Sequence, residues 1–264
     1  MKWNTIMCRY KKIFRYIPNL VNRVFTRFLK KIKYFRTFDE YEKNIRGHNG
    51  EVRTFDKYRK DIRSQNGEDG VTLEILKRLK INNGWFCELG AWDGKFLSNT
   101  YFLISKGWKG IYIEGDKTKY SELVRNVKKF KDKIYPVCAY ITTKGENSLD
   151  NILANTPLPY DFEILSIDID GDDYFVWESL NNYKPKIVII EVNSGYLPNI
   201  KITSTKNNKG TSFFSTVLLG KNKGYLPVYH TGNIFFVRKD YINNLGLTEK
   251  ELKDPRSLFD YSWL

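Results

Sequence analysis

Carboxylates gather where two apolar runs of the chain end, and they are the side chains with the clearest chemistry. In the run Leu165–Tyr174, LSIDIDGDDY, strand alternation places Asp168 and Asp170 on one face. Neighbouring carboxylates repel each other, a cost tolerated when one of them holds a proton, binds a cation or acts as a base. We take Asp170 as the first candidate base and Asp168 as the second. The competing interpretation is that an aspartate here only caps the following helix, a role that suits Asp172 or Asp173.

A second polar pair follows the next apolar run. Glu191 and Asn193 share a face by the same alternation. With Asp168 or Asp170 their oxygens could bind a hard divalent cation, and the same groups could instead bind substrate hydroxyls. His230, where a later run ends, is the third candidate base, with a structural role as its alternative.

Glycines mark a ligand-binding turn earlier in the chain. The run WFCELGAWDG spans Trp85–Gly94, and a second run, IYIEGD, ends 20 residues beyond Gly94 at Glu114. The E-x-G-x-x-x-G spacing lacks the G-x-G-x-x-G of pyrophosphate-binding folds and suits a nucleoside without phosphates, such as S-adenosylmethionine. An ordinary strand-to-helix turn is the alternative. The predicted cofactor-binding residues are Glu88, Gly90, Gly94, Glu114, Asp116 and Ala139.

Alternating strands and helices must position these groups. Strands are expected at 85–89, 110–114, 134–139, 162–168, 187–192, 226–230 and 234–237, and helices at 64–79, 95–105, 119–130, 148–154, 174–181 and 211–221. This order, closed by a hairpin at Thr231-Gly232, predicts an α/β fold of the class I methyltransferase (Rossmann-like) type. We expect a seven-stranded, mostly parallel sheet with a C-terminal antiparallel hairpin, formed by residues 64–264.

Residues 1–63 are predicted to be an accessory segment. Residues 1–38 hold 11 Lys/Arg and no Asp/Glu, so of the net charge of +14 the rest of the chain carries 33 − 30 = +3. Residues 11–36 are predicted to be a basic amphipathic helical segment, with a short turn before Pro18 and a longer helix after it. This segment would bind an anionic membrane surface or pack on its own body or a second subunit. Because the body is nearly neutral, nucleic acid is an unlikely partner.

The cysteine content favours a reducing compartment. Cys8, Cys87 and Cys138 form neither a disulfide framework nor a metal-binding spacing. The chain has no uncharged apolar run of 18 residues and no secretory apolar region at its start. We therefore expect a cytoplasmic protein, with peripheral membrane attachment as an option.

Four ordered motifs between Ser64 and Val237 resemble the FkbM-type methyltransferases. These are the SQ-x-GED segment at 64–69, GAWDGKFLSNTY, IYIEGD and SIDIDG, followed by the closing GY…GNIFFV. The resemblance implies S-adenosylmethionine as cofactor and O-methylation of a hydroxyl, often on a sugar. Asp170 stands where many relatives have glutamate, so its acid is shorter.

The expected function is therefore methyl transfer to a hydroxyl-bearing small molecule or glycan. Two other classes stay open at this point. One is a catalytically silent relative that binds a partner or a membrane, and the other is a nucleic-acid methyltransferase tethered by its basic arm. The second lacks the N/D-P-P-Y/F sequence expected of amino-methylating DNA enzymes.

Overall fold

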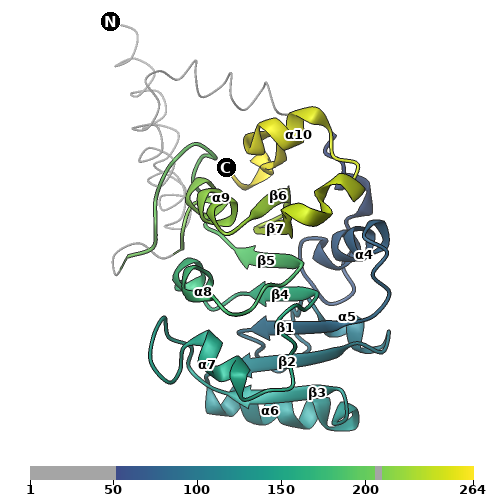
Figure 1. Ribbon diagram of the computed structural model, residues 1–264, viewed down its shortest axis with the longest axis vertical. Coiled ribbons are helices and arrows are strands. Elements are labelled where there is room, and N and C mark those ends of the chain that lie inside the picture. Colours follow the sequence, from purple (N-terminus) through teal and green to yellow (C-terminus); the bar gives the residue numbers. More distant parts are fainter. Residues whose placement is uncertain (1–51, 206–209) are drawn as a thin grey trace, which may run out of the picture. The chain divides into compact units, whose positions relative to one another are not determined.

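The computed structural model describes residues 52–205 and 210–264, which belong to one compact unit (Figure 1). The predicted basic helix, residues 11–36, lies outside the described residues.

A seven-stranded sheet forms the centre of the described unit. Its strands are β1 (Trp85–Leu89), β2 (Lys109–Glu114), β3 (Ile134–Cys138), β4 (Ile164–Ile167), β5 (Ile187–Glu191), β6 (Tyr225–His230) and β7 (Asn233–Arg238). The strand order is β3-β2-β1-β4-β5-β7-β6. The first five are parallel, and β7 runs antiparallel to both β5 and β6. This arrangement confirms the predicted fold class.

Helices cover both faces of the sheet, as parallel strands require. They are α4 (Glu68–Arg78), α5 (Tyr101–Ile104), α6 (Lys117–Val127), α7 (Leu149–Ala154), α8 (Asp173–Ser179), α9 (Phe213–Asn222) and α10 (Glu249–Lys253). One apolar core lies between the sheet and α7, α8 and α9, and it includes Trp177 and Phe213. A second core, with Ile75 and Leu123, lies between the other face and α4, α5 and α6 (Figure 1).

The central strands are buried and largely apolar, apart from Glu88 in β1 and Ser166 in β4, and further polar residues come where the strands end. In the strand register Leu89 of β1 pairs with Ile167 of β4, and Ile167 pairs with Ile190 of β5. The residues that follow, Gly90, Asp168 and Glu191, are therefore brought to the same carboxyl edge. In open α/β sheets this edge is where ligands bind.

One predicted helix is much shorter than expected. The sequence indicated a helix from about Lys95 to Ser105, whereas α5 spans only Tyr101–Ile104. Leu97 has a left-handed backbone, with φ 53°, which breaks a right-handed helix. The next residues then bond to the Glu88 side chain instead of continuing a helix. Local propensity is outweighed here by a buried carboxylate.

Residues 53–59, in the stretch assigned from sequence to the accessory segment, contact the sheet unit directly. Phe55 is fully buried in the second core, and a short 3₁₀ helix, η2 (Asp56–Tyr58), follows it. The side chain of Thr54 donates to Glu251 of α10, with an oxygen–oxygen distance of 2.6 Å. The start of the described chain is thereby attached to its C-terminal part.

Candidate active site at the carboxyl edge of the sheet

Three carboxylates meet where β4 and β5 end. Oxygens of Asp168, Asp170 and Glu191 all lie within 4.8 Å of one another. The sequence predicted this set, with Asn193, as base and cation candidates. Asn193 lies two residues beyond β5, where its Oδ1 accepts a hydrogen bond from the Gly195 amide at 3.1 Å.

The surroundings of two of these carboxyl groups, Asp168 and Glu191, raise their pKa values. Burial, and then the charges of Asp173, Asp170 and Glu68, raise the pKa of Asp168 to about 6. Burial and the neighbouring aspartates raise the pKa of Glu191 to about 8. A side-chain hydrogen bond between the two groups lowers the pKa of Asp168 and raises that of Glu191. The two groups therefore titrate as a pair that shares a proton near neutral pH.

The loop after β4 is held by Asp173, the first residue of α8. Asp173 Oδ1 accepts from the Ile169 amide at 2.8 Å, and Oδ2 accepts from the Gly171 amide at 2.9 Å. These bonds fix Asp170 in a left-handed conformation, φ 59°, that costs energy for a residue other than glycine. The sequence suggested Asp172 or Asp173 as a helix cap, and Asp173 instead shapes the loop that presents Asp170.

The predicted glycine turn lies directly beside this acidic loop. Gly90 has a φ of 72°, and its amide donates to the carbonyl of Ile113 in β2 at 3.0 Å. A Cβ at Gly90 would lie 1.8 Å from the carbonyl oxygen of Asp168. Only glycine therefore fits at this junction between β1 and β4. Gly90 is exposed, whereas Gly94 is buried and a Cβ there would lie 2.3 Å from Leu123 of α6.

Glu114, at the end of β2, faces the same turn. Its Oε2 accepts from the Trp92 amide at 2.8 Å, and its Oε1 accepts from the Asp116 amide at 2.7 Å. Each carboxylate oxygen offers two acceptor positions and accepts one hydrogen bond from the described residues, so each has the capacity for a second. The residue is 7% exposed, and its carboxylate lies beside the glycine turn.

Glu88 has an internal role in this structure. Its oxygens accept from Ser98 Oγ at 2.7 Å, from the Asn99 amide at 3.1 Å and from the Thr100 hydroxyl. Burial raises the pKa of Glu88 to about 7, against the opposite effect of these hydrogen bonds. Glu88 therefore fixes the segment behind the turn and does not point into solvent.

Asp116 and Ala139, also predicted for cofactor binding, lie at the neighbouring strand ends. The side chain of Asp116 caps α6 by accepting from the amides of Thr118 and Lys119, at 2.8 and 2.9 Å. The Ala139 amide donates to the carbonyl of Glu114 at 3.1 Å. A binding role for these two residues stays a prediction.

Tyr140 was not among the sequence candidates. It is 70% exposed, and its ring lies against Gly115, where a Cβ would come within 2.7 Å of the ring. An exposed aromatic face next to Glu114 is a surface for stacking a base. The signal in the sequence was weak, since one tyrosine follows an ordinary apolar strand.

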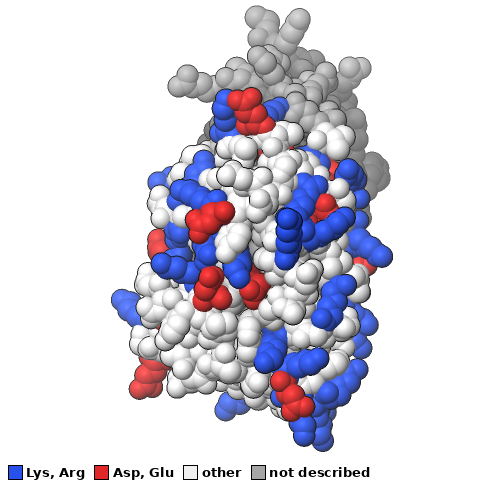
Figure 2. Space-filling model, turned by 45° about the vertical axis from the view of Figure 1, so that its right-hand side comes forward, with Lys and Arg blue, Asp and Glu red and all other residues white. Residues whose placement is uncertain are grey.

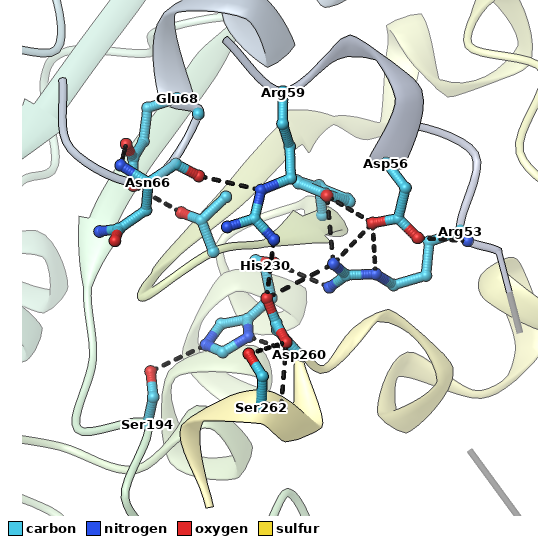
Figure 3. Close-up of polar contacts among 12 residues, drawn as sticks. Arg53, Asp56, Arg59, Asn66, Glu68, Ser194, His230, Asp260 and Ser262 are labelled. Atoms are coloured by element: carbon cyan, nitrogen blue, oxygen red, sulfur yellow. Dashed lines mark hydrogen bonds and ion pairs between the residues drawn. The ribbon is translucent and has the colours of Figure 1, made fainter. Parts of the chain in front are cut away.

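His230 is not available as a base in this structure. The residue is fully buried, its Nδ1 accepts from the Asp260 amide at 2.9 Å, and its Nε2 lies 2.9 Å from Ser194 Oγ (Figure 3). Because Nδ1 is an acceptor, Nε2 carries the hydrogen and donates it to Ser194. Burial lowers the pKa of His230 to about 3. The structural alternative for this histidine fits its surroundings.

A network around His230 joins distant parts of the chain. Arg53 donates to the carbonyl of His230 at 2.8 Å and lies 2.6 Å from Asp56 and 3.6 Å from Asp260 (Figure 3). Arg59 pairs with the same Asp260 at 2.9 Å. These contacts fix the C-terminal segment against the hairpin.

The buried acid of the SQ-x-GED segment also reaches the hairpin. Glu68, at the start of α4, accepts from Thr231 Oγ1 at 2.7 Å, and its charge contributes to the raised pKa of Asp168. The 64–69 segment therefore lies close to the acidic trio, which its distance in sequence did not reveal.

Comparisons with known proteins find only distant structural likenesses. No family model matches the sequence, and no relative is found among the curated proteins. Among solved structures, TrmK of M. capricolum with S-adenosylhomocysteine is 16% identical, with a TM-score of 0.39 over 68% of this chain and 73% of that one. A SAM-dependent methyltransferase from Aquifex aeolicus is 12% identical, with a TM-score of 0.37 over 62% and 86%.

A third similar structure is the C-terminal domain of precorrin-6Y C5,15-methyltransferase from Rhodobacter capsulatus. It is 16% identical, with a TM-score of 0.31 over 52% of this chain and 68% of that one. Likenesses at this level carry no assignment of substrate or cofactor. Among the described helices, none is long and apolar enough to cross a bilayer.

Proposed function

We propose that this protein is an S-adenosylmethionine-dependent methyltransferase that acts on a hydroxyl group. The observation that carries the proposal is the division of one sheet edge into two halves. The exposed Gly90 turn and Glu114 form one half, and the carboxylates of Asp168, Asp170 and Glu191 form the other. A donor nucleoside and an acceptor hydroxyl need such adjacent sites.

The residues at the first half fit an adenosyl group without phosphates. Glu114 keeps acceptor positions for ribose hydroxyls, and Tyr140 offers an exposed ring beside it. The cofactor would supply an electrophilic methyl group on a sulfonium, so the protein needs no group to activate the methyl. What this chain must do is hold the two partners in line and accept a proton.

Asp168 is the base that the geometry favours, ahead of Asp170. Asp168 is half-buried and has a pKa near 6, close to the pH at which a general base works best, whereas Asp170 is exposed. The acceptor hydroxyl would donate to Asp168 and lose its proton to it as the oxygen forms its bond to the methyl carbon. Glu191, hydrogen-bonded to Asp168, sets the orientation of that base. Asp170 would bind a neighbouring hydroxyl.

A glycan or another polyhydroxylated small molecule is the acceptor class that suits the trio. Carboxylates bind neighbouring hydroxyls well, and the FkbM-type resemblance points to sugars as well. A divalent cation remains an alternative use of the same oxygens, because Asp168, Asp170 and Glu191 have the chemistry of a hard-cation site. Removing divalent ions with a chelator distinguishes the two uses. An enzyme whose carboxyl groups share a proton keeps its activity, whereas one that needs the cation loses it.

The experiment follows the methyl group. The full chain is incubated with methyl-labelled S-adenosylmethionine and a panel of oligosaccharides, and both labelled product and S-adenosylhomocysteine are measured. Asp168→Asn should abolish turnover and keep cofactor binding, with Asp240→Asn, an exposed aspartate on the segment after β7, as the matched control. Unchanged turnover in both Asp168→Asn and Asp170→Asn would remove both residues from the mechanism.

A further inference from the structure

A second surface lies next to the glycine turn and is apolar. The side chains of Trp92, Phe96 and Leu97, here called the 92–97 surface, are 45, 57 and 41% exposed. The rings of Trp92 and Phe96 touch, with their centroids 5.8 Å apart. Single exposed apolar residues are common, but three large ones within six residues mark a contact surface.

The 92–97 surface is held rigidly on α6. Asp93 Oδ1 accepts from the Phe96 amide at 2.6 Å, and Asn126 of α6 donates to the Asp93 carbonyl at 2.9 Å. Trp92 and Leu97 both have left-handed backbones, with φ of 49° and 53°. Such strain in residues other than glycine persists only where the surroundings impose it, and it concentrates in functional segments. The side chains are therefore presented outward by a fixed loop.

Positive charge lies beside Trp92 and continues along α6. Lys119 of α6 lies with its Nζ 3.8 Å from the centroid of the Trp92 ring. Residues 117–133, which form α6 and the segment up to β3, contain seven Lys/Arg and two Asp/Glu, a net charge of +5. Residues 39–264 together carry a net charge of only +3, so the net charge of residues 117–133 is larger than that of residues 39–264 as a whole. Blue side chains outnumber red ones at the lower end of Figure 2, where α6 lies in Figure 1.

We propose that the 92–97 surface and residues 117–133 form a docking surface for an anionic lipid bilayer. Aromatic and aliphatic side chains insert into the interface between head groups and acyl chains, while Lys and Arg bind the anionic head groups. Nucleic acid suits the surface less well, because Leu97 offers no ring for stacking a base. The surface belongs to the folded unit and borders the Gly90–Gly94 turn, where the Trp92 amide donates to Glu114 at 2.8 Å. Lipid binding is proposed in addition to the methyl transfer above.

A polarity-sensitive dye at the apolar tip reads insertion directly, even if other segments also bind lipid. Leu97→Cys is made in the full chain with Cys8→Ser and Cys138→Ser, and buried Cys87 is kept. The dye should brighten and shift to the blue on vesicles containing phosphatidylserine and stay unchanged on phosphatidylcholine alone. Tyr160→Cys, 67% exposed on the segment before β4, is the control position and should not respond.

Vesicle flotation of the unlabelled chain gives the second measurement. Phe96→Ser with Leu97→Asn should weaken binding on the order of tenfold, because two apolar side chains no longer insert. Asn tolerates the left-handed backbone at position 97, so the fold is kept. Tyr160→Ser with Leu252→Gln, which changes two exposed apolar residues elsewhere, is the matched control.

Three results would overturn the proposal. If the fluorescence of the dye at position 97 does not change while the protein floats with anionic vesicles, another segment binds the membrane. Brightening with single-stranded RNA and not with vesicles would make this a nucleic-acid surface. Absence of binding to anionic vesicles would remove the membrane altogether.

Discussion

Asp168 and Glu191 each follow a residue of the paired register position Ile167–Ile190, and this register brings their carboxylate oxygens within 4.8 Å of each other at the ends of β4 and β5. The pair joins two carboxyl groups that would repel each other if both were ionised. A shared proton removes that repulsion, and it leaves Asp168 as an acceptor facing the edge where ligands bind.

The first prediction concerns the pH dependence of turnover. Because Asp168 must be ionised to accept a proton, kcat/KM should rise as the pH passes through about 6. Because a protonated Glu191 orients Asp168, activity should fall again as the pH passes through about 8. Steady-state rates between these limits should give a bell, with apparent pKa values that belong to the pair. Glu191→Gln keeps the hydrogen-bond donor and should remove the alkaline limb, whereas a variant that retains this limb would contradict the role of Glu191.

A stability measurement tests the same pair without substrate. The folded-state pKa values of Asp168 and Glu191 lie above their ordinary values, so the folded state binds the extra protons and stability falls as pH rises through this window. Asp168→Asn should therefore raise Tm relative to the parent chain at pH 8, and the gain should shrink towards pH 5. Thermal unfolding at the two pH values checks this. A gain in Tm that is the same at both pH values would mean that ionisation of these carboxylates does not destabilise the fold.

Two acids at the end of β2 should respond differently to substitution. Glu114→Gln loses a charged acceptor of ribose hydroxyls, so S-adenosylmethionine should bind at least about tenfold more weakly. Asp116→Ala removes the cap of α6 and should cost about 1 kcal/mol of stability, with cofactor affinity unchanged. Calorimetric titration and urea unfolding of both variants separate the effects. Equal loss of cofactor affinity in both would restore Asp116 as a ligand-binding side chain.

His230 should make the fold sensitive to acid. Its folded-state pKa of about 3 lies below the ordinary value, so the unfolded chain binds an extra proton as the pH falls below about 6.5. The free energy of unfolding should then fall by up to about 1.4 kcal/mol per pH unit from this residue alone. His230→Asn removes the titration, and its urea-unfolding curves should show a shallower loss between pH 7 and pH 5. An identical slope in both chains would mean that His230 is protonated in the folded state.

Much of the fold was predictable because the strands carry strong local signals. Apolar runs such as Ile187–Val192 have the length and branching of buried parallel strands, and Thr231-Gly232 marks the hairpin. The helix expected over 95–105 failed because Glu88, distant in sequence, binds Ser98 and Asn99 and breaks it. Helix propensity depends on residues that are close together along the chain, so it does not include the contacts of a buried carboxylate on a neighbouring strand.

The acidic trio was also predictable, since strand alternation and parallel order bring Asp168, Asp170 and Glu191 to one edge. The burial of His230 and the capping of α6 by Asp116 were not. Whether a histidine faces a cleft or a core depends on the C-terminal segment around Asp260, which no local pattern places there. An aspartate before a helix fits both a cap and a ligand, and its hydrogen bonds to Thr118 and Lys119 show the cap.

Titration of the full chain with S-adenosylmethionine tests the central claim most directly. We predict saturable heat at one site per chain, an accompanying rise in Tm, and at least about tenfold weaker binding in Glu114→Gln. Absence of both heat and thermal shift in the parent chain would contradict an adenosyl site between Gly90 and Glu114, and the proposed methyl transfer with it.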